Sequence, residues 1–246
     1  MKACVLIPIY NHGATIYDVV TELKPLGLRC LIINDGSDSE TRAVLAQLER
    51  AFSWVSVEHH DRNLGRGAAL KTGFRLASRL GYTHALQIDA DGQHDPSDAP
   101  IMLEFARNRP EALILGSPIF DSTAPRARRY GHWISRIWVW IETCSLAIDD
   151  PLCGLRCTPL EPTLRIINRI KCGQHMEFEP EIAVRLFWAG LPVVNVPTRV
   201  RYYSDGISHF DLFRDNVRIS WLHTRLFFSM LPRLGRLIAR NTRSAT

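Results

Sequence analysis

The sequence predicts an α/β fold in which helices flank a mostly parallel, doubly wound sheet. Unbroken apolar runs of strand length recur along the chain, as at residues 3–9 and 28–34. Between these two runs, apolar residues return at helical spacing until Pro25 and Gly27 interrupt the pattern. These residues are Ile16, Val19, Val20 and Leu23. Buried parallel strands have such unbroken apolar runs, and their alternation with helices indicates a parallel sheet.

The same rhythm continues to residue 116. Ser37 and Glu40 have the spacing of a capping box, which predicts a helix from there through Arg50. Residues 54–58 alternate as a shorter strand, and a glycine-punctuated stretch after Asn63 enters a helix that ends near Gly81. We also expect strands at residues 83–89 and 112–116 and a helix that begins at Pro96.

The second half of the chain is less regular. Apolar residues at 133, 137, 138 and 141 predict an amphipathic helix with arginines before it, and residues 149–156 are rich in turn formers. Residues 174–188 predict a helix, and residues 191–203 predict one or two strands. We therefore expect a domain of residues 1–210 and a basic amphipathic helical tail of residues 211–246.

The charge of the chain is unevenly distributed. Its 246 residues carry a net charge of +5, and seven arginines against Asp215 give the stretch after residue 213 an excess of six. The rest is near −1, so the composition argues against a uniformly basic nucleic-acid binder and for a local anionic partner. The six cysteines have no paired spacing and no signal-peptide cleavage site is visible, which favours a reduced, cytoplasmic protein.

The motif with most chemical content is LQIDADGQHDP at residues 86–96, where an apolar strand ends in carboxylates. Side chains at positions i, i+2 and i+4 of an extended segment point the same way, so Asp89, Asp91 and Gln93 can converge on one cation. Oxygen donors suit Mg²⁺ or Mn²⁺ better than Zn²⁺. Taken alone, a D-x-D motif is more often a polar turn after a strand.

Two further groups lie at expected ligand-binding positions. Asp35 follows the second strand, where a carboxylate can accept hydrogen bonds from a base or a ribose, although Asp-Gly-Ser is also an ordinary turn. Lys71 follows the start of a helix whose N-terminus could meet phosphate. The G-x-G-x-x-G fingerprint of dinucleotide-binding proteins is absent from this stretch, which disfavours that class.

The order of PIYN, INDGS, NLGRGAALKTG, DADGQHDP, D-P-x-x-G-x-R and F-E-P-E over residues 3–210 resembles the inverting family 2 nucleotide-sugar glycosyltransferases with the GT-A fold. Within that family, it resembles the branch of dolichyl-phosphate mannose synthase and other polyprenyl-phosphate glycosyltransferases. The resemblance implies a metal site at Asp89, Asp91 and Gln93. It implies nucleotide-sugar contacts from Pro8, Tyr10, Asn11, Asp35, Lys71, Asp89, Arg156 and His209.

The resemblance also implies acceptor contacts and catalytic carboxylates. Arg129 and Arg136 match basic residues of the acceptor loop, and Asp150, Glu179 and Glu181 match positions where a base is expected. The sequence departs from the family pattern at two places. The family's glutamate after P-x-Y-N is His12 here, and its R-x-x-G-x-S-K segment begins at Tyr203 and ends at His209. The second departure removes an Arg and a Lys, and His209, Arg199 and Arg201 are near enough in sequence to replace their charges at the diphosphate.

These features predict a metal-dependent inverting transferase that moves a sugar from a UDP-, GDP- or dTDP-sugar to a lipid-linked or membrane-associated acceptor. A hydroxyl acceptor would need a base, whereas a lipid phosphate is already anionic and needs none. The alternative is a membrane-associated nucleotide-sugar binding protein without turnover. We expect no nucleic-acid partner, because no recognition motif accompanies the arginines.

The tail bears on location. A bilayer-spanning helix needs about 20 largely uncharged residues, and Arg225, Pro232 and Arg233 interrupt this one. We expect residues 211–238 to lie in the interface at the cytoplasmic face of the inner membrane, with arginines on anionic headgroups. A helix docked on its own domain, or on a second subunit in a homodimer, is the alternative.

Overall fold

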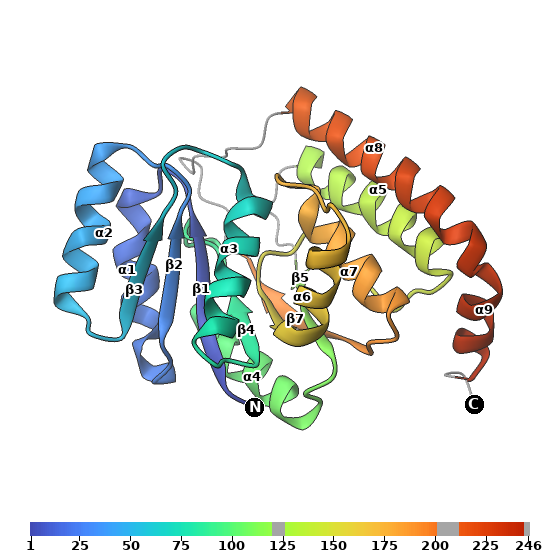
Figure 1. Ribbon diagram of the computed structural model, residues 1–246, viewed down its shortest axis with the longest axis horizontal. Coiled ribbons are helices and arrows are strands. Elements are labelled where there is room, and N and C mark those ends of the chain that lie inside the picture. The colour runs from blue at the N-terminus through green and yellow to red at the C-terminus, as the bar shows by residue number, and fades with distance from the viewer. Residues whose placement is uncertain (120–125, 201–211, 244–246) are drawn as a thin grey trace.

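The computed structural model describes residues 1–119, 126–200 and 212–243. Its centre is a seven-stranded sheet in the order β3-β2-β1-β4-β6-β5-β7 (Figure 1). The strands are β1 (Ala3–Ile9), β2 (Cys30–Asn34), β3 (Val55–His59), β4 (His84–Gln87), β5 (Leu113–Ile119), β6 (Arg156–Pro159) and β7 (Val193–Arg199). Among these described strands, β6 alone runs antiparallel to its neighbours. The predicted α/β fold with a mostly parallel sheet is confirmed.

Helices cover the sheet on both faces and form two apolar cores. The helices are α1 (Gly13–Leu23), α2 (Ser39–Ala51), α3 (Arg66–Arg79), α4 (Ala99–Asn108), α5 (Arg126–Thr143), α6 (Leu160–Arg169), α7 (Phe178–Trp188), α8 (Leu212–Met230) and α9 (Leu234–Arg243). The first core joins α1, α2 and α4 to one face of the sheet. The second joins α3, α6, α7 and the inner sides of α5, α8 and α9 to the other.

Local details of three predicted elements differ from the sequence analysis. The capping box at Ser37 is wrong: Asp38 is the N-cap of α2 and accepts from the Thr41 amide at 2.8 Å. Ser37 instead accepts from the backbone amide of Asn11, since its side chain turns toward the end of β1. The helix expected from residue 174 begins at Phe178, and the predicted turn at residues 149–156 leads into β6 and α6, which the sequence analysis missed.

The C-terminal helices are docked on the domain. Leu222, Leu226, Met230 and Leu237 are buried in the second core, and α8 lies beside α5 (Figure 1). Arg240 of α9 donates to the carbonyl of Phe187 near the end of α7 and to the carbonyl of Leu191, which follows α7. None of the helices in the described part of the chain is long and apolar enough to cross a membrane.

Candidate functional site

The candidate site lies at the carboxyl edge of the central strands. Because β1, β2 and β4 are parallel neighbours, the residues that follow them meet at one edge of the sheet. Tyr10 and Asn11 follow β1, Asp35 follows β2, and Asp89 follows β4. Thr15 at the start of α1 donates to the Ala90 carbonyl at 2.6 Å, which holds the Asp89–Asp91 turn against α1.

Asp89 is held by a basic residue that the sequence analysis did not single out. Arg66, the first residue of α3, forms an ion pair with the Asp89 carboxylate. The same guanidinium donates from Nε to Glu179 Oε2 at 2.7 Å, so it bridges the end of β4 to α7. His94 Nε2 lies 3.6 Å from the other Asp89 oxygen. Burial opposes ionisation, yet Arg66 and His94 hold the pKa of Asp89 well below its usual range.

Asp91 has an environment of the opposite kind. One of its oxygens accepts from the Gln93 amide at 3.0 Å, which closes the turn. Burial and the neighbouring Asp89 charge raise the pKa of Asp91, even though His94 and His12 favour its anionic form. An anionic carboxylate with this surplus of negative charge is stabilised by a cation.

The residues of this turn are of the type that binds a divalent cation together with further ligands. No three His, Cys, Asp or Glu side chains of the described residues are grouped closely enough to form a metal site alone. Asp91 and Asp89 supply hard oxygen donors two residues apart, and the half-buried Gln93 supplies an amide oxygen. Mg²⁺ is typically bound by one or two carboxylates together with substrate phosphates, which matches this donor set.

Glu179 and Arg156 are buried side chains connected to Asp89 through Arg66. Glu179 is 4% exposed, accepts from Gln87 Nε2 at 2.6 Å and lies 3.6 Å from Arg156. Arg156 is 1% exposed and donates to the carbonyls of Pro151 and Cys153, so it braces the loop at 149–154. Because it is buried, Arg156 is not exposed at the carboxyl edge of the sheet.

The other two candidate catalytic carboxylates are also buried. Asp150 is 3% exposed and accepts from the Leu152 amide at 2.8 Å. Glu181 is fully buried, with Arg185 and Arg225 on one oxygen and the Gly173 amide on the other. The structure brings Glu179 to the metal motif, whereas the contacts of Glu181 tie α7 to α8.

Two of the residues expected to contact the nucleotide, Asp35 and Asn11, form hydrogen bonds to neighbouring loops at the carboxyl edge of the sheet. Asp35 is buried and accepts from the Leu64 and Gly65 amides and from His60, so both of its oxygens are engaged. Asn11 adopts φ 54°, which Asn tolerates better than most residues, and accepts from the Asp38 amide. Pro8 is buried within β1 and Tyr10 is half-buried at its end.

The remaining predicted contacts fall away from the metal motif or outside the described residues. Lys71 donates to the carbonyls of Cys172 and Gly173 and lies over the Phe178 ring, so it supports the loop before α7. Arg136 of α5 donates to the Asp149 carbonyl beside Asp150. The side chain of Arg129 and the whole of His209 and Arg201 lie outside the described residues.

Comparison with known proteins identifies the family. The model of Glycosyl transferase family 2 matches residues 4–169, which is more than half of the chain. The protein belongs to that family. It is therefore a glycosyltransferase, and the resemblance to the polyprenyl-phosphate branch is confirmed by its relatives.

Two of these relatives align along most of their length. The polyprenol monophosphomannose synthase of Mycolicibacterium smegmatis is 31% identical over 218 residues, which cover 84% of this chain and 80% of the relative. The undecaprenyl-phosphate mannosyltransferase of Micrococcus luteus is 26% identical over 80% of this chain and 82% of the relative.

Solved structures show the same fold. Glucosyl-3-phosphoglycerate synthase from Mycobacterium tuberculosis, in complex with Mn²⁺, UDP and its product, matches with a TM-score of 0.66 at 17% identity, over 95% of this chain and 80% of that chain. The mannosyltransferase PcManGT from Pyrobaculum calidifontis, with GDP-Man and Mn²⁺, matches with a TM-score of 0.59 at 13% identity, over 83% and 58%. The GT-A fold is therefore confirmed.

Gly154 is a further residue of the candidate site, and its sequence pattern alone did not indicate its contact. It lies in the loop that Arg156 braces, and a Cβ atom added to it would overlap the Asp89 carboxylate. Its signal in the sequence was the glycine of D-P-x-x-G-x-R, but the partner that requires it lies 65 positions away. Asp89 can sit against this loop only because residue 154 has no side chain.

We expect Gly154→Ala to reduce turnover about 10²-fold, because displacing a ligand-holding group by about 1 Å has that effect. Thermal unfolding should change little, since the group that must move is a half-buried side chain and not the core. The control is Gly131→Ala, where an added Cβ atom meets nothing within 4 Å. Wild-type kcat in Gly154→Ala would show that Asp89 does not need its present position.

Proposed function

We propose that this protein transfers a sugar, with inversion, from a nucleotide-sugar to the phosphate of a long-chain polyprenyl phosphate at a membrane surface. An oxygen of the lipid phosphate forms the new bond to the anomeric carbon. The bond from that carbon to the diphosphate breaks on the opposite face, and its electron pair leaves with the nucleoside diphosphate. Asp89, Asp91 and Gln93 would hold Mg²⁺ or Mn²⁺, which when bound supplies Lewis-acid stabilisation of the departing diphosphate.

The burial of the carboxylates supports an anionic acceptor. Asp150, Glu179 and Glu181 are each less than 5% exposed, and each accepts hydrogen bonds from within the protein. A general base must reach the proton that it removes, directly or through one water. A phosphate oxygen carries no proton to remove, so the proposed acceptor does not require these groups to be accessible. Two relatives are named as a polyprenol monophosphomannose synthase and an undecaprenyl-phosphate mannosyltransferase, and these names support the same acceptor.

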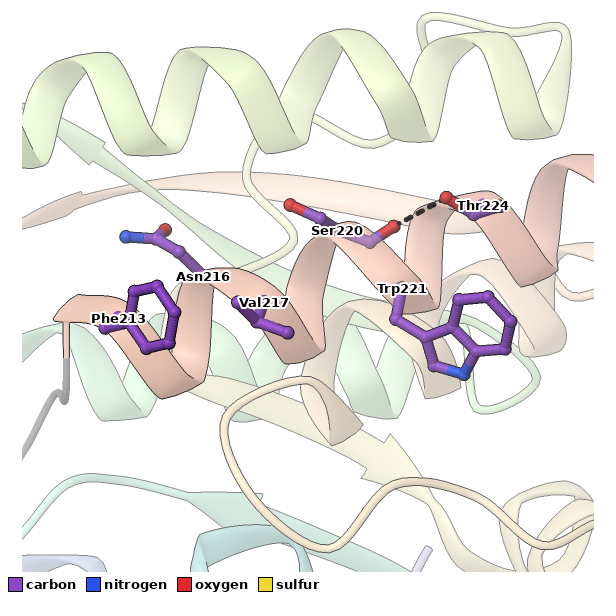
Figure 2. A pocket seen from close by; sticks show the side chains of 6 residues that line it. All are labelled: Phe213, Asn216, Val217, Ser220, Trp221 and Thr224. Atoms are coloured by element: carbon purple, nitrogen blue, oxygen red, sulfur yellow. Dashed lines mark hydrogen bonds between the residues drawn. The ribbon is translucent and has the colours of Figure 1, made fainter.

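An exposed apolar surface supports the membrane location. Phe213, Val217, Trp221 and Phe228 of α8 are all more than half exposed. Figure 2 shows the first three projecting from the stretch of α8 that lines an open depression together with Asn216, Ser220 and Thr224. The surface continues onto α5, because Trp138 meets Phe227 edge to face and Phe227 meets Phe228 in the same way.

The charges beside this surface favour an anionic bilayer. Arg214, Arg233 and Arg236 are exposed, and each lies within two residues in sequence of an exposed apolar residue of the C-terminal helices. Apolar side chains that enter the acyl boundary while arginines meet headgroups are typical of helices that lie in an interface. We infer that α5 and α8 seat the enzyme on the cytoplasmic leaflet, where a lipid phosphate would be presented to the sheet edge.

A matched pair of acceptors tests the reaction. Radiolabelled UDP-, GDP- and dTDP-sugars should each be incubated with Mn²⁺ and either undecaprenyl phosphate or undecaprenol. We expect transfer to the phosphate alone, from one of the donors, and a Glu181→Gln variant that folds should keep most of its kcat. Transfer to the alcohol at an equal rate would contradict the proposed acceptor. Donor binding without turnover on any acceptor would favour the non-catalytic binding protein instead.

A further inference from the structure

We propose that Arg66 sets the order of binding at the metal motif: it neutralises Asp89 so that a divalent cation binds well only together with the diphosphate of the nucleotide. This inference rests on the proposed function for the nature of the diphosphate ligand. It assigns to Arg66 a positioning and charge-tuning role that lies outside the D-x-D-x-Q motif itself.

The position of Arg66 is fixed by contacts on both sides. It begins α3 directly after Gly65, whose φ of 100° is one that L side chains rarely adopt. The Asp35 carboxylate holds the Gly65 amide at 2.8 Å, so the end of β2 determines where α3 starts. From there the guanidinium reaches Asp89 and Glu179, and only 17% of the side chain is exposed.

The charges at the motif explain why such a group matters. Asp89 meets Arg66 on one oxygen and faces His94 on the other, so a cation approaching Asp89 meets a fixed positive charge. Asp91, unlike Asp89, forms no ion pair with another described residue. A single carboxylate is a weak site for Mg²⁺ or Mn²⁺. A bound diphosphate adds negative charge and oxygen donors at once, which offsets the charge of Arg66.

The Arg66 guanidinium has a second ion-pair partner, which holds it in place when a ligand binds. Glu179 binds the Arg66 Nε at 2.7 Å, and Glu179 is itself held by Gln87. Arg66 therefore stays beside Asp89, and its positive charge disfavours the binding of a metal ion to that carboxylate. Removing its charge should free Asp89 to act as a full ligand.

The test measures Mn²⁺ binding directly, from the electron paramagnetic resonance signal of the free ion, with and without UDP or GDP. For the wild-type protein, we expect weak binding of Mn²⁺ alone and at least about tenfold tighter binding when the accepted nucleotide is present. Arg66→Gln and Arg66→Met, which remove the charge, should bind Mn²⁺ alone at least about tenfold more tightly than the wild type. Arg66→Lys, which keeps the charge, should bind like the wild type.

Arg75→Gln is the matched control, because it removes an arginine from the exposed side of the same helix, where Arg75 contacts Asn168. It should leave Mn²⁺ binding unchanged. Circular dichroism confirms that each variant is folded, and two charge-removing variants keep the test valid if one of them is not. Equal or weaker binding of Mn²⁺ alone by Arg66→Gln and Arg66→Met would overturn the proposal. This readout needs no turnover, so it remains informative if the proposed acceptor is wrong.

Discussion

Asp91→Asn should lose most of the transferase activity while the protein keeps its fold. The amide has the shape of the carboxylate but not its charge, so the proposed cation loses a charged ligand, and the departing diphosphate loses part of the stabilisation that this cation would supply. We expect kcat to fall about 10²- to 10³-fold, which is typical when one group that stabilises developing charge is removed. Sugar transfer at saturating donor and Mn²⁺ measures the effect, and thermal unfolding measures the fold.

The stability of this variant should be equal to or slightly above that of the wild type. Burial and Asp89 disfavour the charged form of Asp91, so a neutral side chain relieves repulsion without removing an ion pair. Glu161→Gln is the control, because it makes the same charge change on the exposed side of α6, where Glu161 pairs with Arg165. Full activity of Asp91→Asn, or wild-type activity unchanged by EDTA, would remove the metal from the mechanism.

The fold was predictable because its signals are local. The unbroken apolar runs that became β1 and β2 and the periodic apolar residues of α1 are patterns within short windows. The carboxylates at the end of β4 were predictable for the same reason, since the run and the motif adjoin in sequence. β6 was missed because four residues are too few to show a period, and its antiparallel direction depends on neighbours distant in sequence.

The contacts of the site were not predictable, because they join distant residues. Arg66 meets Glu179 across 113 positions, and nothing near either residue indicates the other. Glu181 matched a family position for a base, but only the packing of α8 shows that Arg225 covers it from 44 positions away. A match to a family motif position therefore did not predict which distant residues a side chain contacts.

The sequence predicts either an interfacial or a docked tail, and the structure shows a docked helix whose other face is exposed. Residues 222, 226, 230 and 237 face the second core, whereas 213, 217, 221 and 228 are exposed. Periodicity indicated an apolar helix but did not separate these two faces. A chain ending near residue 210 would therefore lose core contacts and the partners of Glu142 and Glu181 as well as any membrane contact. Point variants on one face at a time are the better experiment.

Substitutions of two neighbouring residues of α8 should change two different properties, vesicle binding and stability. Trp221 is 66% exposed and Leu222 is 1% exposed, so Trp221→Ser, combined with Phe228→Ser, changes the surface and Leu222→Ala changes the core. We expect the double variant to lose most binding to vesicles with anionic lipid at low salt while its thermal unfolding is unchanged. The arginines beside these residues remain, but each contributes only about 1 kcal/mol near a charged surface.

We expect Leu222→Ala to lose about 2–5 kcal/mol of unfolding free energy, the usual cost of truncating a buried leucine. Below its unfolding temperature it should still bind the vesicles, because the exposed face is intact. Co-sedimentation with anionic and with neutral vesicles, at low and high salt, separates the two faces, since screening weakens binding to anionic headgroups and leaves core packing unaffected. If the Trp221 and Phe228 variant binds vesicles as well as the wild type, the exposed face of α8 serves another partner, and the lipid-phosphate acceptor would have to be reached without it.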